Sequence, residues 1–162
     1  LADSADGDLA GRLRSVADAA ARDPRRKLDQ PFEIAGKLLD GTEFSTRSLR
    51  GKVVLVDFWA TWCGPCVRSL PDLVQLRKQH GDRLAIVGVD SDGDAATLRT
   101  FLAAHPEVDW PQLFAAARWH PLATELGISA IPRVFLIDRE GILRSVDASK
   151  DLEALVRRYL AP

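Results

Sequence analysis

The sequence predicts an α/β fold in which helices cover a central β-sheet. The run Val53–Trp59 has the β-branched and aromatic composition of a strand buried on both faces. A helical segment and a second strand-like run, Leu84–Asp90, follow it, and the chain closes with two strands and a helix after residue 133. Strand–helix–strand followed by a hairpin and a helix is the element order of an α/β layer architecture. With 162 residues, 46% of them hydrophobic, the chain can build one such core.

Composition excludes several classes of function. The 22 Lys and Arg residues nearly balance the 23 Asp and Glu residues, so we expect neither a nucleic-acid surface nor a polybasic membrane patch. The apolar stretches have the length of strands and are too short to cross a bilayer. Because the chain begins with Leu1 rather than Met, we expect that an upstream segment was removed, in the place a signal peptide or membrane anchor would occupy.

Residues 1–30 are expected to form an N-terminal helical extension and linker, and residues 31–162 the folded domain. The extension is dominated by Ala, Asp and Arg and lacks aromatic residues. Asp8 stands near the start of a helical pattern, and Pro24 follows its end. The apolar positions of this pattern are Leu9, Leu13, Val16, Ala17 and Ala20. We expect the helix to pack, or dock loosely, against the domain rather than to bind a ligand.

The first half of the domain is expected to contain a hairpin, a strand and a helix. Residues 38–44 should form two short strands joined by an Asp-Gly turn, and residues 45–49 a helical turn. After the strand at 53–59, a helix is expected over residues 63–80, interrupted by a kink at Pro71.

The second half should complete the sheet and cover it. Gly127 is a natural residue to end a helix, because it adopts the left-handed conformation without strain. The predicted elements are strands over 84–90, 133–138 and 142–147, helices over 95–105, 122–126 and 152–160, and an extended segment over 110–114.

The two cysteines form the motif Cys63-Gly64-Pro65-Cys66, directly after a predicted strand and at the start of a predicted helix. Thiols at this spacing can close a disulfide across one helical turn. The unpaired N–H groups and the dipole of the helix N-terminus favour negative charge, which lowers the pKa of the first thiol below its ordinary value of about 8.5. Cys63 is therefore the expected nucleophile, and the more buried Cys66 the thiol that resolves the mixed disulfide.

The same pair could instead be half of a zinc site. Zinc would need two further nitrogen or sulfur ligands, and only His80, His105 and His120 are available. These histidines are widely spaced and lack the spacing of a zinc motif. We therefore expect no metal site.

The stretch Phe58-Trp59-Ala60-Thr61-Trp62-Cys63-Gly64-Pro65-Cys66 closely resembles the active-site segment of thioredoxins. The wider pattern resembles the extracytoplasmic thioredoxin-like branch of the TlpA- and ResA-type reductases, over about residues 31–162. Its further marks are the segments 39–44, 49–56, 126–132 and 135–141. The resemblance implies a thioredoxin fold: a central mixed β-sheet flanked by helices, with an N-terminal β-hairpin and a central strand–helix insertion at residues 91–131.

The resemblance also implies substrate-binding residues around the dithiol. The Ile131-Pro132 bond matches the family's cis-proline, which presents the backbone of Ile131 to an extended substrate; the alternative is a trans proline opening an edge strand. Trp59 is expected in the core, and Trp62 as exposed apolar surface where partner polypeptides dock. The expected substrate-binding residues are Trp62, Gly64, Pro65, Ile131 and Pro132.

Asp57 stands where thioredoxins place a buried aspartate. In apolar surroundings its pKa should be raised, so that it can accept the Cys66 proton through water; the alternative is a strand-end aspartate held by backbone N–H groups. Two departures accompany it. Residues 86–88 lack the lysine that thioredoxins bury nearby, and Arg133 follows the proline where the family has a small or hydroxyl residue. We hypothesise that Arg133 lies near Cys63 and stabilises its thiolate.

The resulting prediction is a monomeric thiol-disulfide oxidoreductase whose redox-active Cys63–Cys66 disulfide is its whole chemical apparatus, without metal, flavin or nucleotide. By resemblance, it is a reductase in an extracytoplasmic compartment such as the periplasm, serving disulfide, cytochrome or copper-site maturation. It would take electrons from a membrane redox partner and pass them to protein disulfides. Two alternatives stay open: a copper-binding or carrier protein that uses the same cysteines, and a thioredoxin-like interaction module whose dithiol does not turn over.

Overall fold

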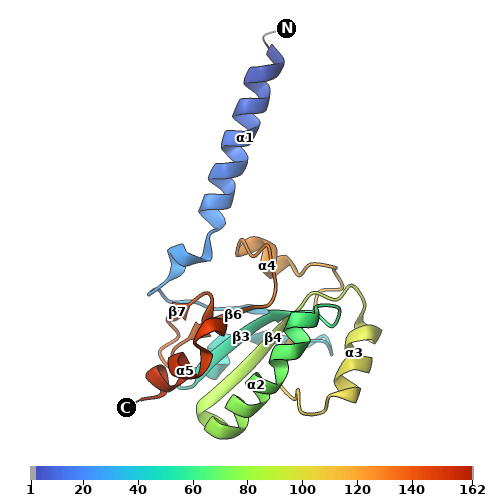
Figure 1. Ribbon diagram of the computed structural model, residues 1–162, viewed down its shortest axis with the longest axis vertical. Helices are drawn as coiled ribbons and strands as arrows, with labels where there is room; N and C mark the ends of the chain where they lie inside the picture. The colour runs from blue at the N-terminus through green and yellow to red at the C-terminus, as the bar shows by residue number, and fades with distance from the viewer. Residues whose placement is uncertain (1–2, 162) are drawn as a thin grey trace.

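The computed structural model describes residues 3–161 and places a five-stranded mixed sheet at the centre of the domain (Figure 1). Strand order is β5-β4-β3-β6-β7. The central strand β3 runs parallel to β4 and antiparallel to β6, and β6 continues antiparallel into β7. The strands are β3 (Val53–Trp59), β4 (Leu84–Asp90), β5 (Gln112–Leu113), β6 (Arg133–Ile137) and β7 (Leu143–Ser145). The predicted mixed sheet is confirmed, and every residue of β3 is buried.

Helices from three parts of the chain cover one face of the sheet. They are α2 (Gly64–His80), α3 (Ala95–Ala104) and α5 (Leu152–Leu160). Their apolar residues join one core cluster with alternate residues of β3, such as Leu55 and Trp59. The intervening β3 residues, such as Val56, face a second cluster with the N-terminal segment and α4 (Pro121–Glu125). The period-two alternation of a strand therefore divides the core between two faces.

Helix α2 carries the cysteine motif and follows the predicted bounds. Pro65 occupies its first turn, where the missing N–H costs nothing, and Gly81 ends it with φ +52°. Pro71 lies inside the helix, which continues through it to His80. The helix is therefore not broken at Pro71, and the kink expected there stays a prediction. A proline removes only its own N–H from the ladder, and the hydrogen bonds on either side can continue.

The N-terminal hairpin is confirmed as a small separate sheet, although its first strand lies before the predicted range of residues 38–44. Strand β1 (Ala35–Lys37) pairs antiparallel with β2 (Glu43–Ser45). In the turn, the Asp40 carboxylate accepts the Thr42 N–H at 2.9 Å and its hydroxyl at 2.7 Å, and Gly41 adopts φ +88°. The predicted helical turn follows as η2 (Thr46–Leu49).

The central insertion contains α3, β5 and α4, as expected. Its aromatic residues form part of the core: Trp110 is buried, and Phe114 and Trp119 pack against the two clusters. Leu122 is likewise partly buried. These side chains therefore support the insertion itself.

The N-terminal extension differs from the prediction in length and packing. Helix α1 spans Asp3–Arg22, beginning five residues before Asp8, and projects away from the sheet (Figure 1). Leu13 and Val16 are 62% and 66% exposed, so this part of the helix does not pack on the domain as expected. The helical spacing predicted a helix, but spacing alone does not specify what covers its apolar side. Among the described helices, none is long and apolar enough to cross a membrane.

Candidate active site

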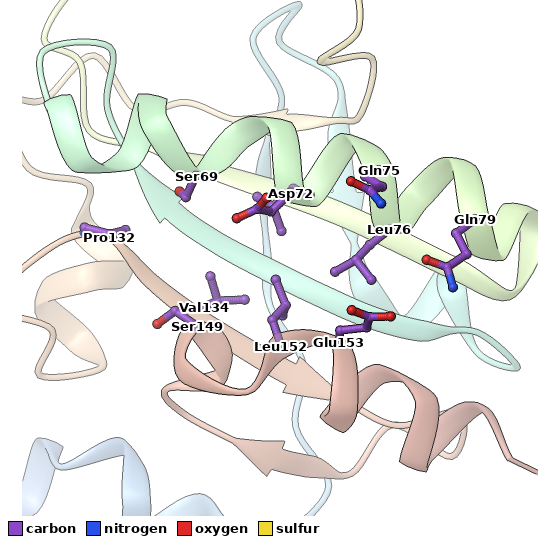
Figure 2. A pocket seen from close by; sticks show the side chains of 11 residues that line it. Ser69, Asp72, Gln75, Leu76, Gln79, Pro132, Val134, Ser149, Leu152 and Glu153 are labelled. Carbon is purple, nitrogen blue, oxygen red and sulfur yellow. The ribbon is translucent and has the colours of Figure 1, made fainter.

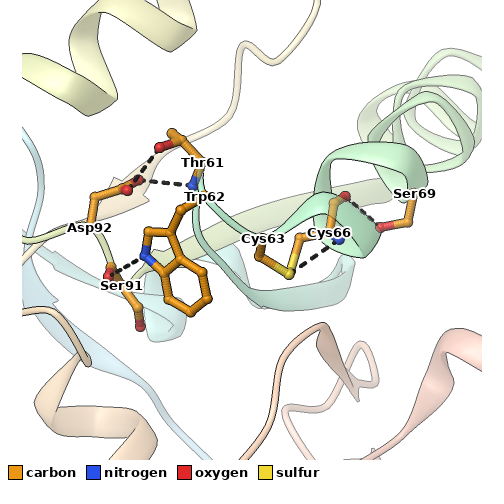
Figure 3. Close-up of a disulfide and its surroundings, with 7 residues drawn as sticks. All are labelled: Thr61, Trp62, Cys63, Cys66, Ser69, Ser91 and Asp92. Atoms are coloured by element: carbon orange, nitrogen blue, oxygen red, sulfur yellow. Dashed lines mark hydrogen bonds between the residues drawn. A yellow bond between two sulfur atoms is a disulfide. The ribbon is translucent and has the colours of Figure 1, made fainter.

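Cys63 and Cys66 form a disulfide at the start of α2, where their Cα atoms are 5.3 Å apart (Figure 3). Both residues are buried, with 5% of Cys63 and 1% of Cys66 exposed. Cys66 is thus the less accessible of the two residues, as expected. The disulfide lies beside the exposed Trp62, the last residue before the motif.

The N-terminus of α2 is arranged to stabilise negative charge on Cys63. Cys63 is the N-cap residue, and its Sγ accepts the backbone N–H of Cys66 at 3.3 Å. No acidic residue lies in the first turn of the helix, so no nearby carboxylate opposes this charge from the helix itself. After reduction, the same N–H group and the helix dipole favour a thiolate at Cys63.

Asp57 is buried in the core, with 1% of its surface exposed. Neither carboxylate oxygen has a hydrogen-bond partner among the described residues, and burial raises its pKa from 3.8 to about 7. Along β3 it alternates with Val56 and Phe58, so its side chain points to the sheet face that carries both cysteines. The predicted raised pKa is confirmed. The alternative, an aspartate held by backbone N–H groups, is not what the structure has.

The residue opposite Asp57 on β4 is Gly88, so no lysine takes the place it has in thioredoxins. A Cβ at Gly88 would lie 1.8 Å from Oε1 of Gln112, whose side chain occupies this space. The same Oε1 accepts the Trp59 indole N–H at 2.9 Å. Trp59 is fully buried, as predicted, and the hydrogen-bonded Trp59 and Gln112 side chains fill the core next to Asp57.

The Ile131–Pro132 peptide bond is cis, as predicted. Pro132 lies at one end of a cavity of about 340 Å³ between α2 and the segment that leads into α5 (Figure 2). Leu73, Leu76, Val134 and Leu152 line its apolar part. Val134 is also the β6 partner of Asp57 in the strand register, so the cavity runs along the side of the sheet where Asp57 is buried.

Arg133 does not lie where the thiolate hypothesis requires. Along β6, Val134 belongs to the core cluster that contains the cysteines, so the alternating Arg133 points to the opposite face. Its Nη1 is 3.6 Å from Oδ2 of Asp147. The hypothesis that Arg133 tunes Cys63 is therefore wrong, because closeness to Pro132 in sequence does not give closeness on the same face of the sheet.

The end of β4 and the loop after it contain functional candidates that sequence reasoning missed. Asp90, the last residue of β4, is buried, as are Ser91 and Asp92 in the loop, and Asp92 accepts hydrogen bonds from Thr61 in the active-site loop. Burial, together with the neighbouring Asp92, raises the pKa of Asp90 to about 8. The available signal was the register of parallel strands, since Trp59 lies opposite Asp90 and Thr61 therefore comes level with Asp92.

The three histidines do not gather at the cysteines. His105 Nδ1 lies 3.2 Å from Oε1 of Glu107, and His120 Nδ1 accepts the Leu122 N–H at 3.1 Å. In the part of the chain that the structure describes, no three His, Cys, Asp or Glu side chains are grouped to hold a metal ion.

Comparisons with known proteins agree with this geometry. The chain is 27% identical over 120 residues to the thioredoxin-like protein YneN of Bacillus subtilis, covering 72% of this chain and 68% of that protein. It is 27% identical over 104 residues to the thiol-disulfide oxidoreductase ResA of Bacillus thuringiensis, covering 64% of this chain and 58% of ResA. A solved structure described as a putative thiol:disulfide interchange protein DsbE from Chlorobium tepidum is 29% identical, with a TM-score of 0.70 over 83% of this chain and 98% of that one.

The fold is the thioredoxin fold, and together with the dithiol it defines the thioredoxin-like class of thiol-disulfide oxidoreductases. The chain belongs to the Redoxin family, whose model matches residues 27–157.

Proposed function

We propose that this protein reduces disulfides in other proteins in an extracytoplasmic compartment. The observation that carries the proposal is the Cys63–Cys66 disulfide, whose first sulfur caps α2 and accepts the Cys66 N–H at 3.3 Å. Asp57 lies buried on the same side of the sheet with a pKa raised to about 7. These three groups supply a stabilised thiolate, a resolving thiol and a proton acceptor near neutral pH.

The reaction begins with the reduced protein. The Cys63 thiolate attacks one sulfur of the substrate disulfide, an S–S bond forms between them, and the substrate's second sulfur leaves as a thiolate that takes up a proton. Cys66 then loses its proton to Asp57, through a water molecule, and attacks Cys63. The S–S bond between Cys63 and the substrate breaks, and the substrate's first sulfur leaves as a thiolate that takes up a proton. Two electrons pass from the dithiol to the substrate, and the Cys63–Cys66 disulfide is the oxidised product.

The surface around the disulfide supports binding of an extended polypeptide. Trp62 is 60% exposed, and we assign it, together with Gly64 and Pro65, to one side of the substrate. Ile131 and Pro132 would contact the other side. No metal, flavin or nucleotide is required by this scheme.

The electrons that reduce the Cys63–Cys66 disulfide after each turnover would come from another protein. By the resemblance to ResA- and TlpA-type reductases, we propose a membrane redox partner as electron donor and a monomeric state for this protein. The substrates would be protein disulfides that arise in disulfide, cytochrome or copper-site maturation.

The test is insulin reduction with dithiothreitol as electron source, combined with trapping by Cys66→Ser. We expect turnover by the wild type and stable mixed disulfides through Cys63 in the variant. The matched control is Cys63→Ser, which should form none. Absence of both turnover and trapping would support a module that does not turn over. Tight binding of Cu(I) by the reduced protein, without insulin reduction, would support the copper alternative.

A further inference from the structure

The loop after β4 holds the two residues that precede the active-site cysteine (Figure 3). The Asp92 carboxylate accepts the Thr61 backbone N–H at 3.0 Å through Oδ2 and the Thr61 hydroxyl at 2.8 Å through Oδ1. The Trp62 indole N–H donates to the Ser91 carbonyl at 3.3 Å. Both residues before Cys63 are therefore bonded to the start of the central insertion.

This loop is itself fixed from several sides. The Ser91 N–H donates to the Trp59 carbonyl at 2.9 Å, and Ser91 Oγ accepts the His120 N–H at 3.1 Å. The Asp92 N–H donates to Oδ2 of Asp90 at 3.0 Å. Asp92 is 3% exposed, so its hydrogen bonds are largely shielded from water. A buried carboxylate with two bonds to one residue is a firm anchor for that residue.

The position of Trp62 depends on such an anchor because most of its side chain is exposed and little of it packs against the core. The side chain is 60% exposed, and its indole N–H donates a long hydrogen bond, at 3.3 Å, to the Ser91 carbonyl. The position of the indole beside the disulfide therefore depends on the backbone at residues 61–62. The hydrogen bond to the Cys63 sulfur comes from a different part of the site, the Cys66 N–H at the start of α2. The Asp92 carboxylate bonds to Thr61 instead.

We propose that Asp92 is a positioning residue that acts through Thr61 to hold Trp62 as the docking surface for protein substrates. The inference rests on the proposed function and adds which residue governs substrate binding. It separates two properties of the site: Asp92 governs how well a folded or extended polypeptide docks, and the N-terminus of α2 governs the reactivity of Cys63.

The central test compares Asp92→Ala with the wild type on two substrates. For insulin we expect KM to rise roughly tenfold with little change in kcat, since two hydrogen bonds to a buried charge are lost. For hydroxyethyl disulfide, which is too small to need the indole surface, the rate should stay within about twofold of the wild type. The pH profile of Cys63 alkylation in the reduced protein should also be unchanged.

Asp92→Asn serves as the conservative variant. The oxygen of the new amide can still accept the Thr61 N–H, and its nitrogen can donate to the Thr61 hydroxyl, so we expect the KM for insulin to return to within about threefold of the wild type. If Asp92→Ala does not fold, Thr61→Val removes only the hydroxyl bond and should raise this KM roughly threefold.

Asp138 provides a matched control. It is 4% exposed, and its carboxylate holds a loop by accepting the N–H groups of Glu140 at 3.0 Å and Ile142 at 2.9 Å. It follows β6, which is antiparallel to β3, so it lies at the other end of the sheet from Cys63. Asp138→Ala should lower the thermal unfolding temperature and leave both KM values unchanged.

Three outcomes would overturn the inference while the proposed function stands: an unchanged KM for insulin in Asp92→Ala, an equal loss on the small disulfide, or the same KM effect in Asp138→Ala. A wild type that reduces neither insulin nor hydroxyethyl disulfide would instead refute the proposed function, and the role of Asp92 with it.

Discussion

Replacing Asp57 with Asn should change both the stability of the protein and the second step of its reaction. Burial raises the pKa of Asp57 from 3.8 to about 7, which corresponds to about 4 kcal/mol at 1.36 kcal/mol per pKa unit. The folded protein holds this proton more tightly than the unfolded chain does. Between about pH 4 and pH 7 the wild type should therefore lose stability as pH rises, and above that range the loss should level off. The amide introduced by Asp57→Asn carries no charge at any pH, so the stability of this variant should not show this loss between about pH 4 and pH 7.

The assay is urea unfolding of the oxidised wild type and Asp57→Asn at several values between pH 4 and pH 9. As pH rises across this range, the free energy of unfolding of the variant should increase relative to that of the wild type by as much as about 4 kcal/mol. Other groups, such as Asp90, titrate in both proteins and cancel in the difference. In the same variant, release of product from the mixed disulfide should slow about 100-fold at pH 7, because the proton acceptor for Cys66 is lost. Parallel stability curves would show that Asp57 does not titrate in the folded state, and the reasoning from its burial would then fail.

Three further predictions concern other parts of the molecule. In the reduced protein, iodoacetamide should modify Cys63 with a midpoint below the ordinary thiol pKa of about 8.5, and Cys66 much more slowly; equal rates would contradict the role of the helix N-terminus. Burial lowers the pKa of His120 from 6.5 to about 4, so the wild type should lose stability as pH falls through this range, and urea unfolding of His120→Asn should show a smaller loss. Gly88→Ala places a Cβ against the buried Gln112 side chain and should lower the free energy of unfolding by roughly 1–3 kcal/mol. In a Gln112→Ala background, which already lacks the hydrogen bond to Trp59, the same substitution should cost much less, and an additive loss would disprove the clash.

The sequence predicted the elements whose pattern is local. Residues 53–59 and 152–160 have the observed bounds of β3 and α5. A run of β-branched and aromatic residues is complete within the first segment, and a helical spacing is complete within the second. The disulfide and the cis Ile131–Pro132 bond were likewise predicted, the first from spacing at a helix start and both from the family resemblance. Helix α1 was foreseen as a helix, but its start and its exposed apolar side were not, since both depend on what surrounds it.

The error at Arg133 and the omission of Asp92 have one cause. Both expectations followed distance along the chain, whereas the sheet determines which side chains meet. The predicted strand at 133–138 already placed Arg133 with Phe135 and away from Val134, and this alternation excludes a position beside Cys63. For Asp92, the needed information was that β3 and β4 are adjacent and parallel with Trp59 opposite Asp90.

The chemistry of the site and its choice of substrate therefore depend on different kinds of contact. Cys63, Cys66 and the N–H group that bonds them lie within one turn of α2, so a nine-residue motif is enough to specify them. The position of Trp62 depends on Asp92, which is thirty residues away in sequence and belongs to the central insertion. A protein can thus keep the same dithiol reaction while a change in the insertion alters which polypeptides dock beside it. Resemblance at the motif is accordingly good evidence for the reaction, whereas the loop after β4 carries information about the substrate that the motif does not contain.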